Sequence, residues 1–339
     1  RTGFAHLDPG EREQRIRQGR VPPWLVAAEA RLRQPAQLFL GVELGPASYG
    51  EARVVVLPAP LEATVSYGRG TAAGPQALLD ASTQVELFDE ELLCPLLPAV
   101  HTLAAPILPP DPAEAVAVLR HAATGPLADG KLLLTLGGEH TVTVGPAAAA
   151  ATRHPGLGVL HLDAHLDLRD RYEGSPFSHA CAIRRLVDDL GLPVVQVGIR
   201  SFSAEEAELL RQRNYRPFFA HQLDAAGRWI AEVVARLPEQ VYVTLDLDVL
   251  DPAELPGTGT PEPGGLRYRE LLVLLRAVAA SRRIVAADLV ELSPLPGSCV
   301  SEFCAARLAA KLIAYTQPGV PGVLPDAVSL SPPLPAWPR

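Results

Sequence analysis

The chain of 339 residues has no methionine, few aromatic residues (5%) and only four cysteines. Because even an initiating methionine is missing, we expect that these residues are not the raw translation product. The cysteines show no CxxC spacing and are too sparse for a disulfide-stapled secreted domain, which predicts reduced thiols in a cytoplasmic protein. No apolar run approaches the roughly 20 residues of a membrane span, and the polar first twenty residues lack a signal-peptide core. We therefore expect no membrane partner.

The chain also lacks an excess of positive charge. It has 30 Lys and Arg residues against 38 Asp and Glu residues, a formal net charge of -8 and a sequence pI of about 5.6. A nucleic-acid groove or an anionic membrane surface needs clustered positive charge, so neither is expected as the main partner. A small cationic substrate suits this balance better.

Short β-branched runs alternate with longer amphipathic segments from about residue 52, which is typical of βα units and a parallel sheet. The patterns predict strands at 53–57, 131–136, 158–162, 194–197, 216–219, 241–245 and 283–287. They predict helices at 112–123, 141–153, 179–190, 204–213, 228–237, 268–281 and 301–315. We expect an N-terminal arm at 1–50, one α/β domain at 51–316 and a proline-rich tail at 317–339.

Four of these strands are followed by hard, metal-competent side chains. The segments are GGEH at 137–140, DAHLD at 163–167, DLD at 246–248 and DLVE at 288–291. Ligands of open parallel sheets gather at the carboxyl ends of the strands, so these side chains should meet at one edge. In DAHLD and DLD, a spacing of two puts the polar side chains on one side of an extended segment.

The side chains that we expect to meet are two imidazoles and four carboxylates, namely His140, Asp163, His165, Asp167, Asp246 and Asp248. One such residue alone would ordinarily be a cap or a paired core residue. Six together need a shared reason, because the carboxylates would repel one another unless cations neutralised them. We predict two divalent metal ions. Nitrogen and oxygen ligands without thiolate favour Mn²⁺, and Co²⁺, Ni²⁺ or Fe²⁺ are compatible.

At these residues the sequence resembles the ureohydrolases, the family of arginases, agmatinases and formimidoylglutamases. GGEH, DAHLD, TLDLDVLDP at 244–252, PGTGTPEPGGL at 256–266 and DLVELSP at 288–294 stand in the family's order. The resemblance covers roughly residues 52–316. It implies a three-layer αβα fold with a central, mostly parallel β-sheet and a ureohydrolase catalytic domain at 51–316.

The resemblance also implies a role for each site residue. Asp163 and Asp246 would bridge two Mn²⁺ ions, His140 and Asp167 would complete one ion, and His165 and Asp248 would complete the other. A metal-bridging hydroxide would then attack the guanidinium carbon of the substrate. His179 matches the family's proton-shuttling histidine, and Glu291 matches the carboxylate that pairs with the guanidinium. His161 shares a strand face with Asp163, and its role stays open between orienting a ligand and packing.

The segment after DAHLD bears on the substrate. Arginases typically have an Asn-x-His stretch there to read the amino-acid end of arginine, whereas this chain has RDRYEGSPFSHACAIRRL, which resembles microbial agmatinases. The resemblance therefore implies hydrolysis of agmatine to putrescine and urea, a step of polyamine biosynthesis, in a homo-oligomer of three or six subunits. Ala180 and Cys181 depart from the usual Gly and Thr. A guanidinobutyrase, guanidinopropionase or guanidine hydrolase therefore stays open, as do a catalytically silent regulatory subunit and a dinuclear phosphatase.

Overall fold

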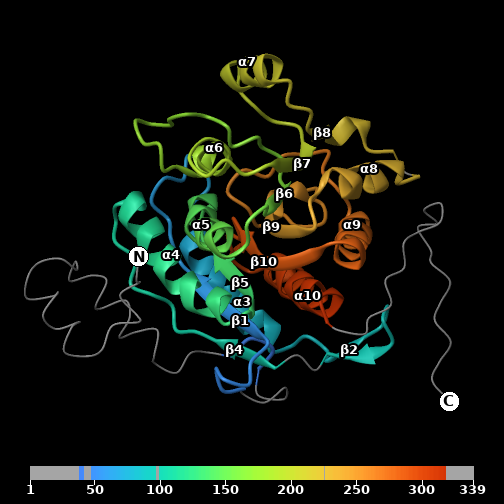
Figure 1. Ribbon diagram of the computed structural model, residues 1–339. Helices are drawn as coiled ribbons and strands as arrows, with labels where there is room; N and C mark the ends of the chain where they lie inside the picture. The colour runs from blue at the N-terminus through green and yellow to red at the C-terminus, as the bar shows by residue number, and fades with distance from the viewer. Residues whose placement is uncertain (1–37, 42–46, 97–98, 225, 318–339) are drawn as a thin grey trace, which may run out of the picture.

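The computed structural model describes residues 38–41, 47–96, 99–224 and 226–317 (Figure 1). Most of the arm expected at 1–50 and nearly all of the tail expected at 317–339 lie outside these residues. The described part of the arm includes Phe39 and Leu40, which are buried. The backbone N–H of Phe39 donates to Thr102 Oγ1 at 2.9 Å. Within the described residues, no helix is both long enough and apolar enough to cross a membrane.

Eight strands form one sheet in which every neighbouring pair is parallel. In spatial order they are β4 (Val100–Thr102), β1 (Val54–Ala59), β5 (Leu132–Gly137), β10 (Arg283–Val290), β9 (Gln240–Asp246), β6 (Gly158–Leu162), β7 (Val194–Ile199) and β8 (Phe218–Phe219). A separate two-stranded hairpin joins β2 (Phe88–Asp89) to β3 (Cys94–Pro95).

Helices cover both faces of the sheet (Figure 1). One face packs on α3 (Gly74–Ser82), α8 (Arg228–Arg236), α9 (Tyr268–Ser281) and α10 (Val300–Tyr315). The other packs on α4 (Pro112–Ala128), α5 (Val144–Arg153), α6 (Ala182–Asp188) and α7 (Ala204–Arg213). The expected three-layer αβα architecture is confirmed.

The inner strands are mainly apolar because both of their faces are buried. The few polar side chains within them, such as Thr135 and Asp288, are buried as well. In β1, Val54 and Val56 pack in one hydrophobic layer, while Val55 and Leu57 pack in the other. This alternation follows from the two-residue period of a strand. The sheet therefore separates two cores, and its carboxyl edge is the place where polar side chains can emerge.

Local signals fix several helix ends. The side chain of Ser203 accepts a hydrogen bond from the backbone of Glu206, whose carboxylate accepts one in return, so a capping box begins α7. The helix ends at Asn214, which adopts a left-handed conformation (φ 51°). Similarly, Asp111 accepts from Glu114 N at 2.9 Å at the start of α4.

Some predicted bounds were wrong. The helix expected from residue 141 begins with a 3₁₀ turn, η3 (His140–Thr143), and becomes α-helical at Val144. Likewise, the helix expected at 179–190 begins with η4 (His179–Cys181) and is α-helical only from Ala182 to Asp188. Both tight turns carry a predicted site histidine, whose position is set by contacts across the pocket. The helix α4 continues past the predicted end at 123, and α3 and β4 were not predicted.

Candidate active site

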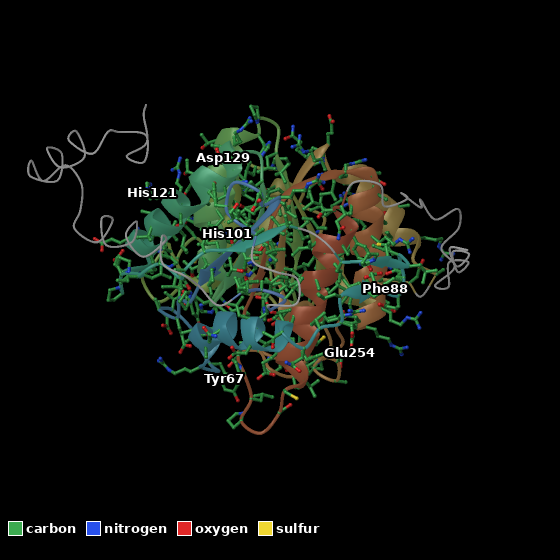
Figure 2. The ribbon with its side chains drawn as sticks, turned by 90° about the horizontal axis from the view of Figure 1, so that it is seen from below. Tyr67, Phe88, His101, His121, Asp129 and Glu254 are labelled. Carbon is green, nitrogen blue, oxygen red and sulfur yellow. The ribbon has the colours of Figure 1, made fainter. Side chains whose placement is uncertain are left out.

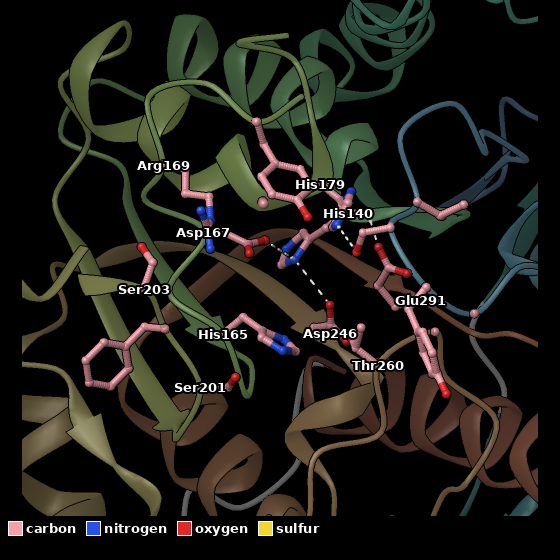
Figure 3. Close-up of a pocket in the computed structure, with 18 of the residues that line it drawn as sticks. His140, His165, Asp167, Arg169, His179, Ser201, Ser203, Asp246, Thr260 and Glu291 are labelled. Atoms are coloured by element: carbon pink, nitrogen blue, oxygen red, sulfur yellow. Dashed lines mark hydrogen bonds and ion pairs between the residues drawn. The ribbon is translucent and has the colours of Figure 1, made fainter. Parts of the chain in front are cut away.

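A pocket of about 240 Å³ opens at the carboxyl edge of the sheet (Figure 3). Six of the eight predicted site residues line it: His140, His165, Asp167, His179, Asp246 and Glu291. The other two, Asp163 and Asp248, lie beneath its floor and are at most 1% exposed. Sequence positions more than 150 residues apart are thus brought together as the strand ends predicted.

The first cluster surrounds the imidazole of His140, which is 1% exposed. Its Nδ1 atom lies 3.2 Å from Asp163 Oδ2, 3.0 Å from Asp167 Oδ2 and 3.3 Å from Asp246 Oδ2. The opposite ring nitrogen, Nε2, lies 2.9 Å from the hydroxyl of Thr244. Nδ1 therefore faces three carboxylates, while the contact of Nε2 with Thr244 fixes the orientation of the ring.

The second cluster surrounds His165, whose Nδ1 atom lies 3.0 Å from Asp248 Oδ2 and 3.4 Å from Asp163 Oδ1. Asp163 belongs to both clusters, since its Oδ2 faces His140 and its Oδ1 faces His165. The ligand-competent atoms of Asp163, His165 and Asp248 lie within 4.8 Å of one another, as do those of His140, His161, Asp163 and Asp167. Two adjacent groups that share one carboxylate are the arrangement that a dinuclear site requires.

The charges of these groups are strongly coupled. Burial by itself lowers the pKa of His140, but three neighbouring carboxylates raise it well above its ordinary value. Burial and the nearby charges of Asp248 and Asp163 raise the pKa of Asp246 well above its ordinary value. Like charges held this close in a low-dielectric interior are costly unless cations neutralise them.

The environment of His140 Nδ1 indicates that these side chains fit divalent metal ions. His140 Nδ1 is buried and makes no hydrogen bond of good geometry, although three carboxylates surround it. If the ring is neutral and Nε2 donates to Thr244, Nδ1 presents a lone pair to those carboxylates, and a cation between them would make this arrangement favourable. Imidazole and carboxylate ligands without thiolate suit a divalent metal with oxygen preference.

Two site residues have a backbone conformation that is uncommon for residues with a side chain. Asp167 has φ 53° and Glu291 has φ 67°, both in the left-handed region. Such conformations are costly and persist where the surrounding contacts impose them, often at functional sites. Glu291 directly follows β10, whereas Asp167 lies in the loop after β6, and both residues line the pocket.

Glu291 is fixed at the end of β10. Its Oε1 atom accepts a hydrogen bond from the backbone N–H of His140 at 2.7 Å, and the residue is 8% exposed. Burial raises the pKa of its carboxyl group to about 8. The second oxygen, Oε2, makes no hydrogen bond that would compete with a ligand in the pocket, as far as the described residues go.

The structure answers the question left open for His161. Its Nε2 atom lies 2.7 Å from Asp163 Oδ2, and its Nδ1 atom lies 3.0 Å from the amide nitrogen of Gln196. Because that amide can only donate, His161 Nδ1 accepts and Nε2–H points at Asp163. His161 therefore orients the shared carboxylate. The strand alternation pointed to His161, but no sequence signal pointed to Gln196.

Sequence reasoning also missed a positive charge in the pocket wall. Arg169 lines the pocket, its guanidinium lies 5.0 Å from the ring centre of Tyr172, and its Nε is 4.0 Å from the Glu206 carboxylate. Tyr67, which is labelled in Figure 2, also lines the pocket, and it is 82% exposed. The pocket thus has an acidic floor and a mixed wall.

Comparisons with known proteins agree with this geometry. Residues 52–315 match the Arginase family. An N(1)-aminopropylagmatine ureohydrolase from Synechocystis sp. is 41% identical, over 79% of this chain and 90% of that protein. An agmatinase from Bacillus cereus is 38% identical, over 73% of this chain and 86% of that protein.

Solved structures lead to the same group. The agmatine ureohydrolase of Thermoplasma volcanium superimposes with a TM-score of 0.75 at 31% identity, over 86% of this chain and 97% of that chain. The parallel sheet, the paired His and Asp clusters at its carboxyl edge and these matches agree. The chain therefore belongs to the arginase family and is an amidinohydrolase of the agmatinase type.

Proposed function

We propose that this protein hydrolyses agmatine to putrescine and urea with two Mn²⁺ ions. The observation that carries this proposal is the pair of clusters that share Asp163 on the floor of a pocket whose wall holds Glu291. An acidic floor suits a substrate that carries a positive charge. The resemblance of the motifs to those of agmatinases supports the choice of reaction.

Six residues would hold the two ions. Asp163 and Asp246 would serve both ions, His140 and Asp167 would complete the first, and His165 and Asp248 would complete the second. When bound, two adjacent cations lower the pKa of a water molecule toward neutrality, which provides the nucleophile, and they neutralise the charge that develops on the substrate.

Two side chains of the pocket act directly on the substrate in this proposal. The free Oε2 of Glu291 pairs with the planar guanidinium and holds its carbon above the floor, which suits the fork geometry of such groups. The attack forms a C–O bond at that carbon, and the C–N bond to the alkylamine then breaks. His179 takes up the proton of the added oxygen, which becomes the carbonyl oxygen of urea, and delivers it to the departing amine nitrogen.

A second candidate substrate is N1-aminopropylagmatine, because the Synechocystis relative at 41% identity is named for it. It carries the same guanidinium as agmatine and differs only at the far end of the chain, where an aminopropyl group is added. The floor of the pocket would therefore bind the guanidinium of both compounds in the same way. Arg169 in the wall gives a reason to include guanidino acids as well, since a guanidinium can bind a carboxylate. Guanidino acids are a weaker candidate than the two amines, because the Arg169 guanidinium already lies 4.0 Å from the carboxylate of Glu206.

The test is urea release from a matched panel with Mn²⁺ and, separately, Ni²⁺. The panel holds agmatine, N1-aminopropylagmatine, arginine, guanidinobutyrate, guanidinopropionate and guanidine. A preference for agmatine supports the proposal in full. A preference for another member of the panel would support the proposed reaction but not agmatine as the substrate, and residues of the pocket wall would then determine the specificity. If metal-loaded protein releases urea from none of these compounds, the proposal is overturned and a catalytically silent subunit is favoured.

A further inference from the structure

The ring of His179 is held by a loop that is distant in sequence. The backbone N–H of His179 donates to Thr64 Oγ1 at 3.0 Å, and the same oxygen lies 3.2 Å from Nδ1 of the ring. Ser66 Oγ lies 3.3 Å from the other ring nitrogen, Nε2. One hydroxyl therefore contacts His179 at two points, on the backbone and on the ring.

A buried carboxylate stands behind that hydroxyl. Glu139 is 0% exposed, and its Oε2 accepts the backbone N–H groups of Ala63 and Thr64, each at 2.6 Å. Its Oε1 accepts the hydroxyls of Thr64 at 2.7 Å and Thr141 at 2.8 Å. All four hydrogen bonds of the Glu139 side chain thus come from donors, as an ionised carboxylate requires.

Counting hydrogens then decides the state of the ring. Thr64 has a single hydroxyl hydrogen, which it donates to Glu139, so its oxygen can only accept from His179. A contact of 3.2 Å between this oxygen and Nδ1 therefore requires a hydrogen on Nδ1. Ser178 Oγ also lies near Nδ1, at a longer 3.4 Å, and can accept in the same way. In the neutral ring, Nε2 is left with the lone pair.

We propose that Glu139 and Thr64 form a relay that fixes His179 in its Nδ1–H tautomer, with Nε2 as the atom that exchanges protons in the pocket. Thr64 is then a positioning residue, not a catalytic one. The inference rests on the proposed function, in which His179 protonates the departing amine. It adds the atom that carries this proton and the groups that select the atom.

The relay also connects two parts of the site. Glu139 directly precedes His140, so one turn supplies both the anchor of the relay and a residue of the first cluster. The proton donor and the floor of the pocket are therefore positioned by the same segment. Buried polar groups that orient functional side chains typically change activity by about 10- to 100-fold when they are removed.

The test uses Thr64→Val, which removes the hydroxyl at nearly constant volume. We expect kcat for urea release to fall about 10- to 100-fold, with KM and metal content nearly unchanged. Thr64→Ser keeps a hydroxyl and should restore most of the rate. Thr141→Val is the matched control, because it removes the other hydroxyl on Glu139 Oε1 without touching His179.

Heteronuclear NMR of the imidazole nitrogens reads the tautomer without any substrate. The His179 signals are identified by their loss in His179→Asn. We expect a protonated Nδ1 and an unprotonated Nε2 in the wild type, and a shift toward the Nε2–H form in Thr64→Val. A wild-type ring protonated on Nε2, or an unchanged kcat in a folded Thr64→Val, would overturn the relay.

The two readouts separate the inference from the proposed function. If His179 has the expected tautomer but the protein hydrolyses no member of the panel, the proposed reaction is wrong and the relay stands. Normal agmatine hydrolysis with the opposite tautomer would remove the relay alone. If Thr64→Val does not fold, the wild-type tautomer and the kcat of Thr64→Ser decide the question.

Discussion

The carboxylate of Glu291 accepts the backbone N–H of His140 at 2.7 Å, although the two residues are 151 positions apart in sequence. The carboxylate proposed to hold the substrate is therefore fixed by the turn that carries a proposed metal ligand. A bound guanidinium lowers the pKa of the Glu291 carboxyl group from its raised value of about 8, so the group is charged in the complex. We expect Glu291→Gln to keep the contact with His140 through its amide oxygen but to lose this charge. The value of kcat/KM for the guanidino substrate should fall by at least about 100-fold, since charge-assisted pairing is lost. Urea release measured beside metal content checks this. Full activity would contradict the role of Glu291.

The proposed metal residues and the proposed proton donor should separate experimentally. His165→Ala or Asp246→Ala removes a residue of the clusters, so we expect metal and activity to be lost together. His179→Ala lies outside both clusters and should retain metal while losing rate, by about 100-fold or more. Elemental analysis of the purified variants beside steady-state kinetics decides this. A metal-replete and active Asp246→Ala would show that the site is assigned wrongly.

The pH dependence of stability should have a measurable contribution from Asp188. Hydrogen bonds from Arg213 and Arg184 lower the pKa of its carboxyl group from 3.8 to about 2. A lowered pKa stabilises the folded state above the unfolded value, and this stabilisation is lost as the pH falls from about 4 to about 2. With partial exposure taken into account, we expect Asp188→Asn to cost about 1 kcal/mol at neutral pH.

Urea unfolding of wild type and variant between pH 7 and pH 3 measures this difference. It should be constant above pH 5 and should shrink below pH 4. Asp189→Asn is the control, because Asp189 is half exposed and lies 3.4 Å from Arg185. A difference at Asp188 that does not change with pH would contradict the electrostatic origin.

A buried ion pair joins the hairpin β2–β3 to α10. The ammonium of Lys311 lies 2.9 Å from Asp89 Oδ2, and the two side chains are 2% and 0% exposed. Removal of one partner leaves a buried charge unpaired, so we expect Lys311→Met to cost about 3 kcal/mol. The double variant with Asp89→Asn should recover part of that loss. A double-mutant cycle measured by urea unfolding tests the coupling, and strictly additive losses would argue against it.

Much of the fold could be predicted because its signals are local. The helices α7 and α9 have the predicted bounds 204–213 and 268–281, and β6 has the predicted bounds 158–162. A capping box and a clear change of hydrophobic period mark these elements. In contrast, α3 begins at Gly74 without a side-chain cap, so the start signal there was Pro75 alone. The three-residue strand β4 is an edge strand that depends on its pairing with β1.

The candidate site divides in the same way. The gathering of His140, Asp163 and their neighbours could be predicted, because parallel strands bring their carboxyl ends to one edge. The contacts of Thr64 with His179 and of Gln196 with His161 could not be predicted. The first pair is 115 residues apart in sequence and the second is 35 residues apart, and each contact depends on how loops or neighbouring strands pack. Neither pair has a spacing rule. The partners that orient the site residues emerge only from the tertiary packing.

The position of Asp163 between the two clusters has a consequence for how the protein would acquire its metals. A carboxylate with one oxygen on each side cannot serve one ion without changing the charge and the orientation that the other ion meets. The two binding steps are then thermodynamically linked, and each ion alters the affinity for the other by the same factor. The occupancy of one metal position would thus depend on the occupancy of the other, and metal supply would act on the two positions jointly.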